Sequence, residues 1–403
     1  MSEQAEVETS LPYWDPYDTE IDDNPYPIWK RLRDDAPVYR NEKYDFWALS
    51  RFDDIEAAHK DTATFSSAHG TVLERMTGDI DGTGMMISMD PPDHSHLRAL
   101  VSRAFTPRRV AALQDRVRAL CAELLDRHRG GTGFDYVRDF AAQLPSRVIS
   151  SLVGVPREDQ EAQRQLVDGM FHIEPGVGMA NETSSRSALA LIGYLGELVA
   201  QRTAEPRDDM VSDLVTAEIA GEAGDRRRLT AGECTAFALL LYTAGTETVA
   251  KLLGNAAVVL AGHPDQRHEL VSEPEVIPNA VEELLRFEPP SPINGRWTTA
   301  GVSLHGVGIP TGSRVLLLTG SAGRDERVFA DPDRFDVHRP VTRHLSFGHG
   351  AHFCIGAALA RLEGTIAIEE TLRRFPDWSV DRTALRRAHT STVRGYEAVP
   401  ILL

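Results

Sequence analysis

Cysteine is scarce in this chain of 403 residues. The three cysteines, Cys121, Cys234 and Cys354, are too few and too far apart to form a disulfide framework. Chains without such a framework are typical of reducing compartments, so we expect a cytoplasmic protein.

Signals for export and for membrane anchoring are also missing. Residues 1–8 are polar and acidic, and they lack the basic and apolar segments of a signal peptide. No run of about 18 apolar residues, the length that crosses a bilayer as a helix, occurs in the sequence. We therefore expect no membrane anchor.

Positive charge is sparse as well. The formal net charge is −17, which argues against nucleic acid as a partner because nucleic acids are polyanions. Lysine occurs at only four positions and arginine far outnumbers it, a bias typical of a high-GC genome. Neither observation points to a particular chemistry.

No linker, low-complexity block or repeat divides the sequence, and a hydrophobic content of 42% is enough for one large core. We predict a mobile leader over residues 1–20 and a single domain over residues 21–403. Apolar periodicity predicts helices along most of the chain, with short strands near 37–49, 296–318 and 377–403. The fold class is therefore mainly α with a minor β portion.

The most informative stretch is a glycine-rich loop over residues 347–356 that leads into a predicted helix over 357–370. Its glycines allow tight turns and the close approach of a flat partner. Cys354 lies just before the helix, where free N–H groups and the helix dipole favour a thiolate. Because no second ligand follows at zinc-site spacing, that thiolate suits one axial bond to a haem iron. The alternative is a buried structural cysteine.

This loop resembles the cysteine-ligand loop of the cytochromes P450, the haem-thiolate monooxygenases. The family has Phe, two residues, Gly, one residue, Arg or His, one residue, Cys, one residue and Gly, and every fixed position is present. The resemblance implies the cytochrome P450 fold with a long central helix over haem b. It implies Cys354 as the iron ligand and, as further cofactor contacts, Phe347, Gly348, His352 and Gly356.

The long central helix is expected between residues 230 and 262, because Thr230 and Glu233 form a capping box at its start. Small residues at Ala244 and Gly245 would let a planar ligand approach the helix. Glu247 and Thr248 resemble the acid and alcohol with which the family relays protons. The alternative is an exposed Glu beside a hydroxyl bonded to its own helix.

Two further groups of charges match the family. Glu283 and Arg286 lie one helical turn apart, and the resemblance adds Arg339 from a later irregular segment, in a structural rather than catalytic role. A haem carries two propionates that need cations. His94 and Arg98 share a helix face, and the resemblance assigns them, with Arg296 and His352, to those propionates.

The resemblance implies a soluble bacterial monooxygenase that uses O₂ to hydroxylate or epoxidise a hydrophobic small molecule. Secondary metabolism is the expected setting, a monomer is expected, and a ferredoxin would supply electrons. The loop over residues 65–90 would close over the substrate. Two alternatives remain, a peroxide-driven peroxygenase and a non-catalytic haem sensor. The arginines expected to receive the ferredoxin are Arg98, Arg103, Arg108, Arg109, Arg116 and Arg118, with Arg343 and Arg361. The alternative is that they form a solvated helix face.

Overall fold

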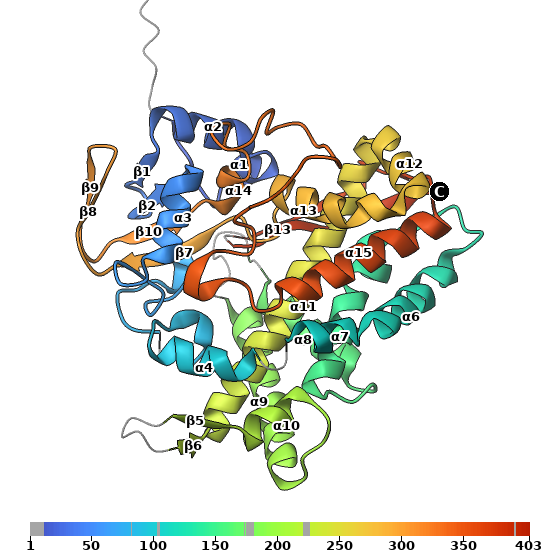
Figure 1. Cartoon of the computed structure of the whole chain (residues 1–403), viewed down its shortest axis with the longest axis horizontal. Coiled ribbons are helices and arrows are strands. Elements are labelled where there is room, and N and C mark those ends of the chain that lie inside the picture. Colours follow the sequence, from blue (N-terminus) through green and yellow to red (C-terminus); the bar gives the residue numbers. More distant parts are fainter. Residues whose placement is uncertain are drawn as a thin grey trace, which may run out of the picture.

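A long helix, α11 (Ala231–Gly262), runs through the middle of the molecule (Figure 1). The computed structural model describes residues 12–81, 83–102, 105–172, 174, 181–220, 226–390 and 392–403. The predicted capping box is confirmed: the Thr230 hydroxyl accepts from the Glu233 N–H, and the Glu233 carboxylate accepts from the Thr230 N–H. At about 1.5 Å per residue the helix is about 48 Å long.

The other helices surround α11 or pack on its neighbours (Figure 1). Helix α15 lies beside α11 and follows the cysteine loop, whereas α8, α9 and α10 cover the half of α11 nearer its N-terminus. A π-helix, η4 (Val137–Ala141), leads into α7. The α-helices are α1 (Thr19–Asp23), α2 (Tyr26–Asp35), α3 (Phe52–Lys60), α4 (Asp93–Val101), α5 (Pro107–Ala111), α6 (Gln114–Leu125), α7 (Gln143–Val153), α8 (Gln160–Met170), α9 (Glu182–Ala204), α10 (Met210–Thr216), α12 (Pro264–Ser272), α13 (Ile277–Phe287), α14 (Thr319–Ala322) and α15 (Ala357–Arg374).

The strands form one larger sheet and several small ones. The larger sheet has five strands in the order β1-β2-β10-β7-β3, and β10 runs parallel to β2 but antiparallel to β7. The small sheets pair β11-β14-β4, β12-β13, β5-β6 and β8-β9. The strands are β1 (Val38–Asn41), β2 (Phe46–Leu49), β3 (Phe65–Ser66), β4 (Gly133–Asp135), β5 (Glu218–Ala220), β6 (Arg226–Arg228), β7 (Asn294–Thr298), β8 (Val302–Leu304), β9 (Val307–Ile309), β10 (Arg314–Leu317), β11 (Ser379–Val380), β12 (Arg386–His389), β13 (Arg394–Ala398) and β14 (Pro400–Leu402).

The buried apolar residues fall into three clusters. The first joins α6, α7, α13, α15 and the C-terminal half of α11. The second lies between the N-terminal helices and the five-stranded sheet. The third joins α4, α8, α9 and α10 to the N-terminal half of α11. Helix α11 therefore connects the first and third clusters, and burial of its apolar side chains accounts for its stability despite its length.

Some elements agree with the sequence-based expectation and others differ. The hairpin predicted over 37–49 is confirmed, with Val38 opposite Leu49. The β5-β6 pair was not predicted. Residues 1–11 of the predicted leader lie outside the described ranges. Trp14, also in that leader, is buried because its ring packs against Phe46. Its backbone N–H also donates to the Tyr39 hydroxyl.

Helix α11 is long and apolar enough, by composition alone, to cross a membrane. However, 67% of its most apolar window is buried inside the molecule. Its apolar residues are therefore accounted for by the first and third clusters, as in the core helix of a globular fold.

Candidate functional site

The glycine-rich loop folds back on itself before α15. Gly348 and Gly350 have φ of +69° and +67°, a region that favours glycine. A side chain at Gly350 would lie 2.8 Å from the His59 carbonyl oxygen, so only glycine lets the loop approach α3 this closely. The Cys354 N–H donates to the Phe347 carbonyl at 2.8 Å, which closes the turn and fixes where the thiol lies.

The Cys354 thiol lies at the end of this turn. Cys354 is exposed to solvent, yet the surrounding protein is close enough for burial to raise the pKa of its thiol. The Gly356 N–H and the charges of Arg98 and Arg361 oppose that rise. The sequence led us to expect that the helix start would favour a thiolate, but burial has the larger effect. A metal bonded to the sulfur would reverse this balance, because thiolate is the form that binds metal.

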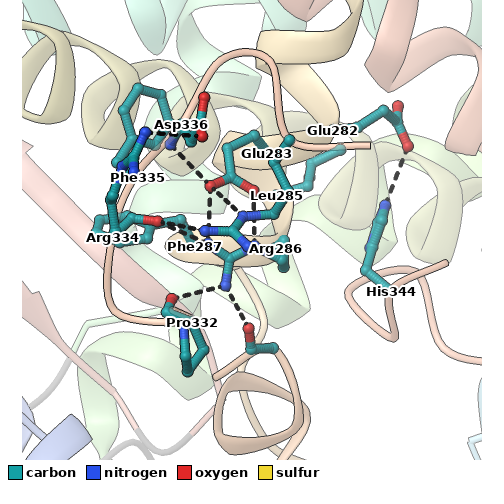
Figure 2. Close-up of polar contacts among 12 residues, drawn as sticks. Glu282, Glu283, Leu285, Arg286, Phe287, Pro332, Arg334, Phe335, Asp336 and His344 are labelled. Atoms are coloured by element: carbon teal, nitrogen blue, oxygen red, sulfur yellow. Dashed lines mark hydrogen bonds and ion pairs between the residues drawn. The ribbon is translucent and has the colours of Figure 1, made fainter. Parts of the chain in front are cut away.

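Helix α13 holds the chain on both sides of the loop, through contacts that sequence reasoning missed. The Ser346 hydroxyl donates to the Leu285 carbonyl at 2.6 Å. Glu282 accepts from Arg361 Nε at 2.6 Å. It also contacts His344 Nε2 at 3.1 Å (Figure 2). Since His344 precedes the loop and Arg361 follows it, α13 fixes both ends. An acid at Glu282 could have been noted from the sequence, but its partners lie 62 and 79 residues away.

The pair predicted within α13 is fully buried and joined to the irregular segment 330–339 (Figure 2). Arg286 donates to both Glu283 oxygens, at 2.6 and 2.8 Å, and Arg339 Nε donates to one of them at 3.1 Å. The remaining guanidinium N–H groups of Arg286 reach backbone carbonyls, those of Gly323, Pro332 and Arg334. These contacts tie α13 to the segment that leads into the loop.

Four predicted cofactor-binding side chains lie near the cysteine loop. The His94 and His352 rings lie 4.1 Å apart between centroids, which joins α4 to the loop. Arg98 donates to the Phe353 carbonyl, and Arg296 is buried on β7. Burial, together with neighbouring cations, lowers the pKa of His94 to about 4 and that of His352 to about 3, and burial lowers the pKa of Arg296 to about 10.

Several polar atoms in this cluster are buried without a partner. They are both ring nitrogens of His94, Nε2 of His352 and Nε of Arg296. Sequence reasoning missed His59 of α3, whose Nδ1 lies 3.4 Å from the Arg296 guanidinium and whose Nε2 is also unpartnered. Buried donors and cations without partners are costly. An anionic group such as a pair of haem propionates would satisfy them, so the residues present fit that cofactor.

The small residues of α11 have different surroundings. Ala244 is exposed on the helix, as a position that faces a ligand requires. A side chain at Gly245 would instead lie 2.9 Å from Ile149 of α7. The close packing of α7 on α11 therefore explains why residue 245 is glycine. The approach of a planar ligand stays a prediction for both Ala244 and Gly245.

Glu247 and Thr248 make their bonds in different directions. The Thr248 hydroxyl donates to the Ala244 carbonyl at 2.9 Å, one turn back along α11. Glu247 is buried, and its Oε1 lies 2.8 Å from the ammonium of Lys251. The predicted alternative is therefore wrong for Glu247, which is not exposed, and correct for Thr248, whose hydroxyl bonds to its own helix.

The loop predicted to close over a substrate contains two short 3₁₀ turns, Leu73–Arg75 and Met86–Ser88, and its residue Gly82 lies outside the described ranges. Met86 is buried in the third cluster together with Phe237 and Leu241 of α11. The end of this loop therefore packs through an apolar side chain against the N-terminal half of α11.

The arginines expected to receive a ferredoxin are largely paired. Arg109 contacts Asp213, Arg118 contacts Glu369 and Glu370, and Arg361 contacts Glu282. Arg103 lies outside the described residues. These carboxylates reduce the local positive charge of the predicted patch.

Within the described ranges no three His, Cys, Asp or Glu side chains gather where they could hold a metal ion. Residues 39–390 match the sequence profile described as cytochrome P450. The chain belongs to the cytochrome P450 family. Cytochrome P450 130 of Mycobacterium tuberculosis (strain ATCC 25618 / H37Rv) is 39% identical over 396 residues, with 94% of each chain covered.

Solved cytochrome P450 structures confirm the predicted fold. Cytochrome P450 CYP109Q5 from Chondromyces apiculatus matches with a TM-score of 0.88 and 34% identity over 98% of each chain. A mutant of P450 EryK in complex with erythromycin B matches with a TM-score of 0.86 and 36% identity, over 94% of this chain and 95% of that one. The family implies a monooxygenase with a haem-thiolate cofactor, O₂ and a redox partner.

The contacts of Glu282 predict how acid weakens this cytochrome P450. Burial opposes the charge of Glu282, but hydrogen bonds from Arg361 and His344 outweigh it and lower the pKa to about 2, from 4.5 for the free side chain. A lowered carboxyl pKa stabilises the fold fully above pH 4.5, and that stabilisation is lost as the pH falls toward 2.

We therefore expect Glu282→Gln to lower the free energy of unfolding by about 3 kcal/mol at pH 7, and this deficit to shrink below pH 4.5. Urea unfolding between pH 7 and pH 3 measures it. Exposed Glu275→Gln, a few residues upstream, is the control and should leave the unfolding free energy unchanged. A deficit for Glu282→Gln that is the same at every pH would contradict the prediction.

Proposed function

We propose that the chain is a cytoplasmic, monomeric monooxygenase, one domain over residues 21–403, with haem b bound through Cys354. The observation that carries this proposal is the set of buried, unpartnered donors of His94, Arg296 and His352 beside the Cys354 loop. In this proposal these side chains and Arg98 hold the two propionates. Phe347, Gly348 and Gly356 shape the loop, and Ala244 faces the ring. Haem bound to a thiolate supplies reductive activation of O₂.

The chain's own contribution to the chemistry would be proton supply on α11. Glu247 is the acid and Thr248 the alcohol of this relay. A buried carboxylate beside a hydroxyl can pass a proton from solvent toward the cofactor face of the helix. The peroxide-driven alternative has less need of such a pair, and a sensor has no need of one.

The substrate in this proposal is a hydrophobic small molecule that is hydroxylated or epoxidised in bacterial secondary metabolism. Two observations support this class. The third cluster offers apolar side chains from α4, α8 and α11. The solved relative P450 EryK holds erythromycin B. Electrons would come from a ferredoxin that docks near Arg98 and Arg108.

The test combines a spectrum with a product. Purified protein, reduced under carbon monoxide, should show the red-displaced absorption band of a thiolate-ligated haem. With a surrogate ferredoxin, its reductase and NAD(P)H, a compound that shifts the Soret band in a hydrophobic substrate screen should yield an oxygenated product.

The control reactions separate the alternatives. Product formation with hydrogen peroxide but not with the reductase system would favour the peroxygenase. A normal spectrum without product under either condition, for every compound that shifts the Soret band, would favour a sensor. The absence of the red-displaced band would reject the whole proposal.

A further inference from the structure

Lys251 is exceptional among the lysines of this chain. The side chains of Lys30, Lys43 and Lys60 are 52%, 58% and 52% exposed, as is usual for lysine. That of Lys251 is 8% exposed, in the middle of α11. Burial of an ammonium is costly unless it is paired, so the position calls for a specific reason.

The partner of Lys251 is the proposed proton-relay acid. Its Nζ lies 2.8 Å from Oε1 of Glu247, one helical turn earlier, and donates to the Tyr396 carbonyl at 3.3 Å. The Glu247 side chain is itself only 11% exposed. The ammonium therefore draws the carboxylate toward β13, whereas the Thr248 hydroxyl bonds back to Ala244.

The neighbouring strand, β13, leaves room for the Lys251 side chain at Gly395. A side chain at Gly395 of β13 would lie 2.8 Å from Cβ, 3.1 Å from Cγ and 2.9 Å from Cδ of Lys251. Gly395 has no left-handed φ in this structure, so its small size rather than its flexibility is what the position requires. Strand β13 thus leaves a slot that fits the lysine stem.

One more charged pair faces Glu247 and Lys251, from α8. Arg164 and Asp168 are joined at 2.5 Å. Burial raises the pKa of Asp168, the charge of Glu247 raises it further, and Arg164 and Lys251 oppose the rise. The surroundings of Glu247 therefore hold one acid, Asp168, and two cations, Arg164 and Lys251, with the Tyr396 carbonyl of β13 beside Lys251.

We propose that Lys251 is a positioning residue, which holds the Glu247 carboxylate at the place from which it supplies protons. The inference rests on the proposed function of Glu247. Without the ammonium, Glu247 would be a buried acid with no cation on its own helix, and it would change its position or its protonation. Displacement of a catalytic group by about 1 Å can cost about 100-fold in rate, so the pair controls proton supply.

The kinetic test uses variants that disturb the pair in two independent ways. Lys251→Met removes the ammonium, and Gly395→Ala fills the slot while it leaves both charges present. We expect both to lower product formed per reductant consumed by about tenfold and to raise the solvent deuterium isotope effect, because proton supply becomes limiting. Substrate affinity from the Soret shift should change by less than about twofold. Lys251→Arg should recover most of the lost coupling.

Lys30→Met is the matched control. Lys30 pairs with Asp34 at the same spacing of four residues and at 3.0 Å, but on the surface. Its loss should leave coupling and the isotope effect unchanged, because exposed pairs contribute little.

A second measurement does not depend on turnover. With ¹⁵N-labelled lysine only four side-chain signals exist, so the Lys251 ammonium can be assigned as the one lost in Lys251→Arg. We expect this signal to be protected from rapid hydrogen exchange and to shift in Glu247→Gln, whereas the other three signals stay in place.

The outcomes separate this inference from the proposed function. If the wild-type protein forms no oxygenated product, the proposed function fails. If it does, but Lys251→Met and Gly395→Ala couple as well as wild type, the positioning role is overturned. An unchanged Lys251 signal in Glu247→Gln would also overturn it.

Discussion

Cys354→Ser is expected to abolish the red-displaced carbon monoxide band and all reductant-dependent product formation. A serine hydroxyl does not ionise near neutral pH and cannot supply a thiolate to a metal. The protein should still fold, since Cys354 is exposed at the end of its loop and serine has nearly its shape. Absorption spectra of the reduced protein under carbon monoxide, with thermal unfolding beside them, measure both expectations.

The other two cysteines provide the controls for this prediction. Cys121 in α6 and Cys234 in α11 are buried in apolar clusters, and neither belongs to the glycine-rich loop. Cys121→Ala and Cys234→Ala should each keep the band, even where they lower the melting temperature. Retention of the band in Cys354→Ser would remove the basis of the proposed function.

Glu283→Gln is expected to destabilise the fold by about 3–5 kcal/mol, because removal of one member of a buried charge pair leaves its partners uncompensated. Arg286 is fully buried and Arg339 nearly so, and Glu283 is the carboxylate that both contact. Burial lowers the pKa of Arg286, and Glu283 opposes this lowering. Loss of the Glu283 carboxylate would therefore destabilise the charged form of the guanidinium further. Urea unfolding at pH 7 measures the cost.

Haem retention gives a second measurement for the same variant. Since α13 is tied to the segment 330–339, which leads into the cysteine loop, we expect Glu283→Gln to lose bound haem at a lower urea concentration than wild type. The surface pair Glu56 and Lys60 is the control, and Glu56→Gln should cost less than about 1 kcal/mol. A cost this small for Glu283→Gln would show that the buried pair is dispensable.

Local signals in the sequence were sufficient for the main elements. The capping box at Thr230 gave the start of α11 because both partners lie within one helical turn. The pair Glu283 and Arg286 was visible for the same reason. The spacing around Cys354 was recognisable because a loop motif is contiguous. Mainly α structure with short strands followed from apolar periodicity.

Other features depend on contacts between distant segments, which a single sequence does not display. Gly245 was interpreted only as room for a ligand, and its close packing on Ile149 of another helix was not predicted. The partners of Glu282 and the buried position of His59 arise only when α3, α13 and the loop meet. Lys251 stands four residues after Glu247, but its burial depends on Gly395, which is 144 residues away.

The separation of the core into three clusters bears on how this enzyme could be re-engineered. Helices α8, α9 and α10 pack in a cluster distinct from the one beneath the cysteine loop, and α11 is the main bridge between them. A graft of residues 155–229 from a relative would exchange the side chains that α8, α9 and α10 contribute to the third cluster, while it left the sulfur ligand and the buried pair of α13 intact. We expect the grafted segment to determine which compounds such chimaeras bind, and the recipient chain to determine their absorption spectrum.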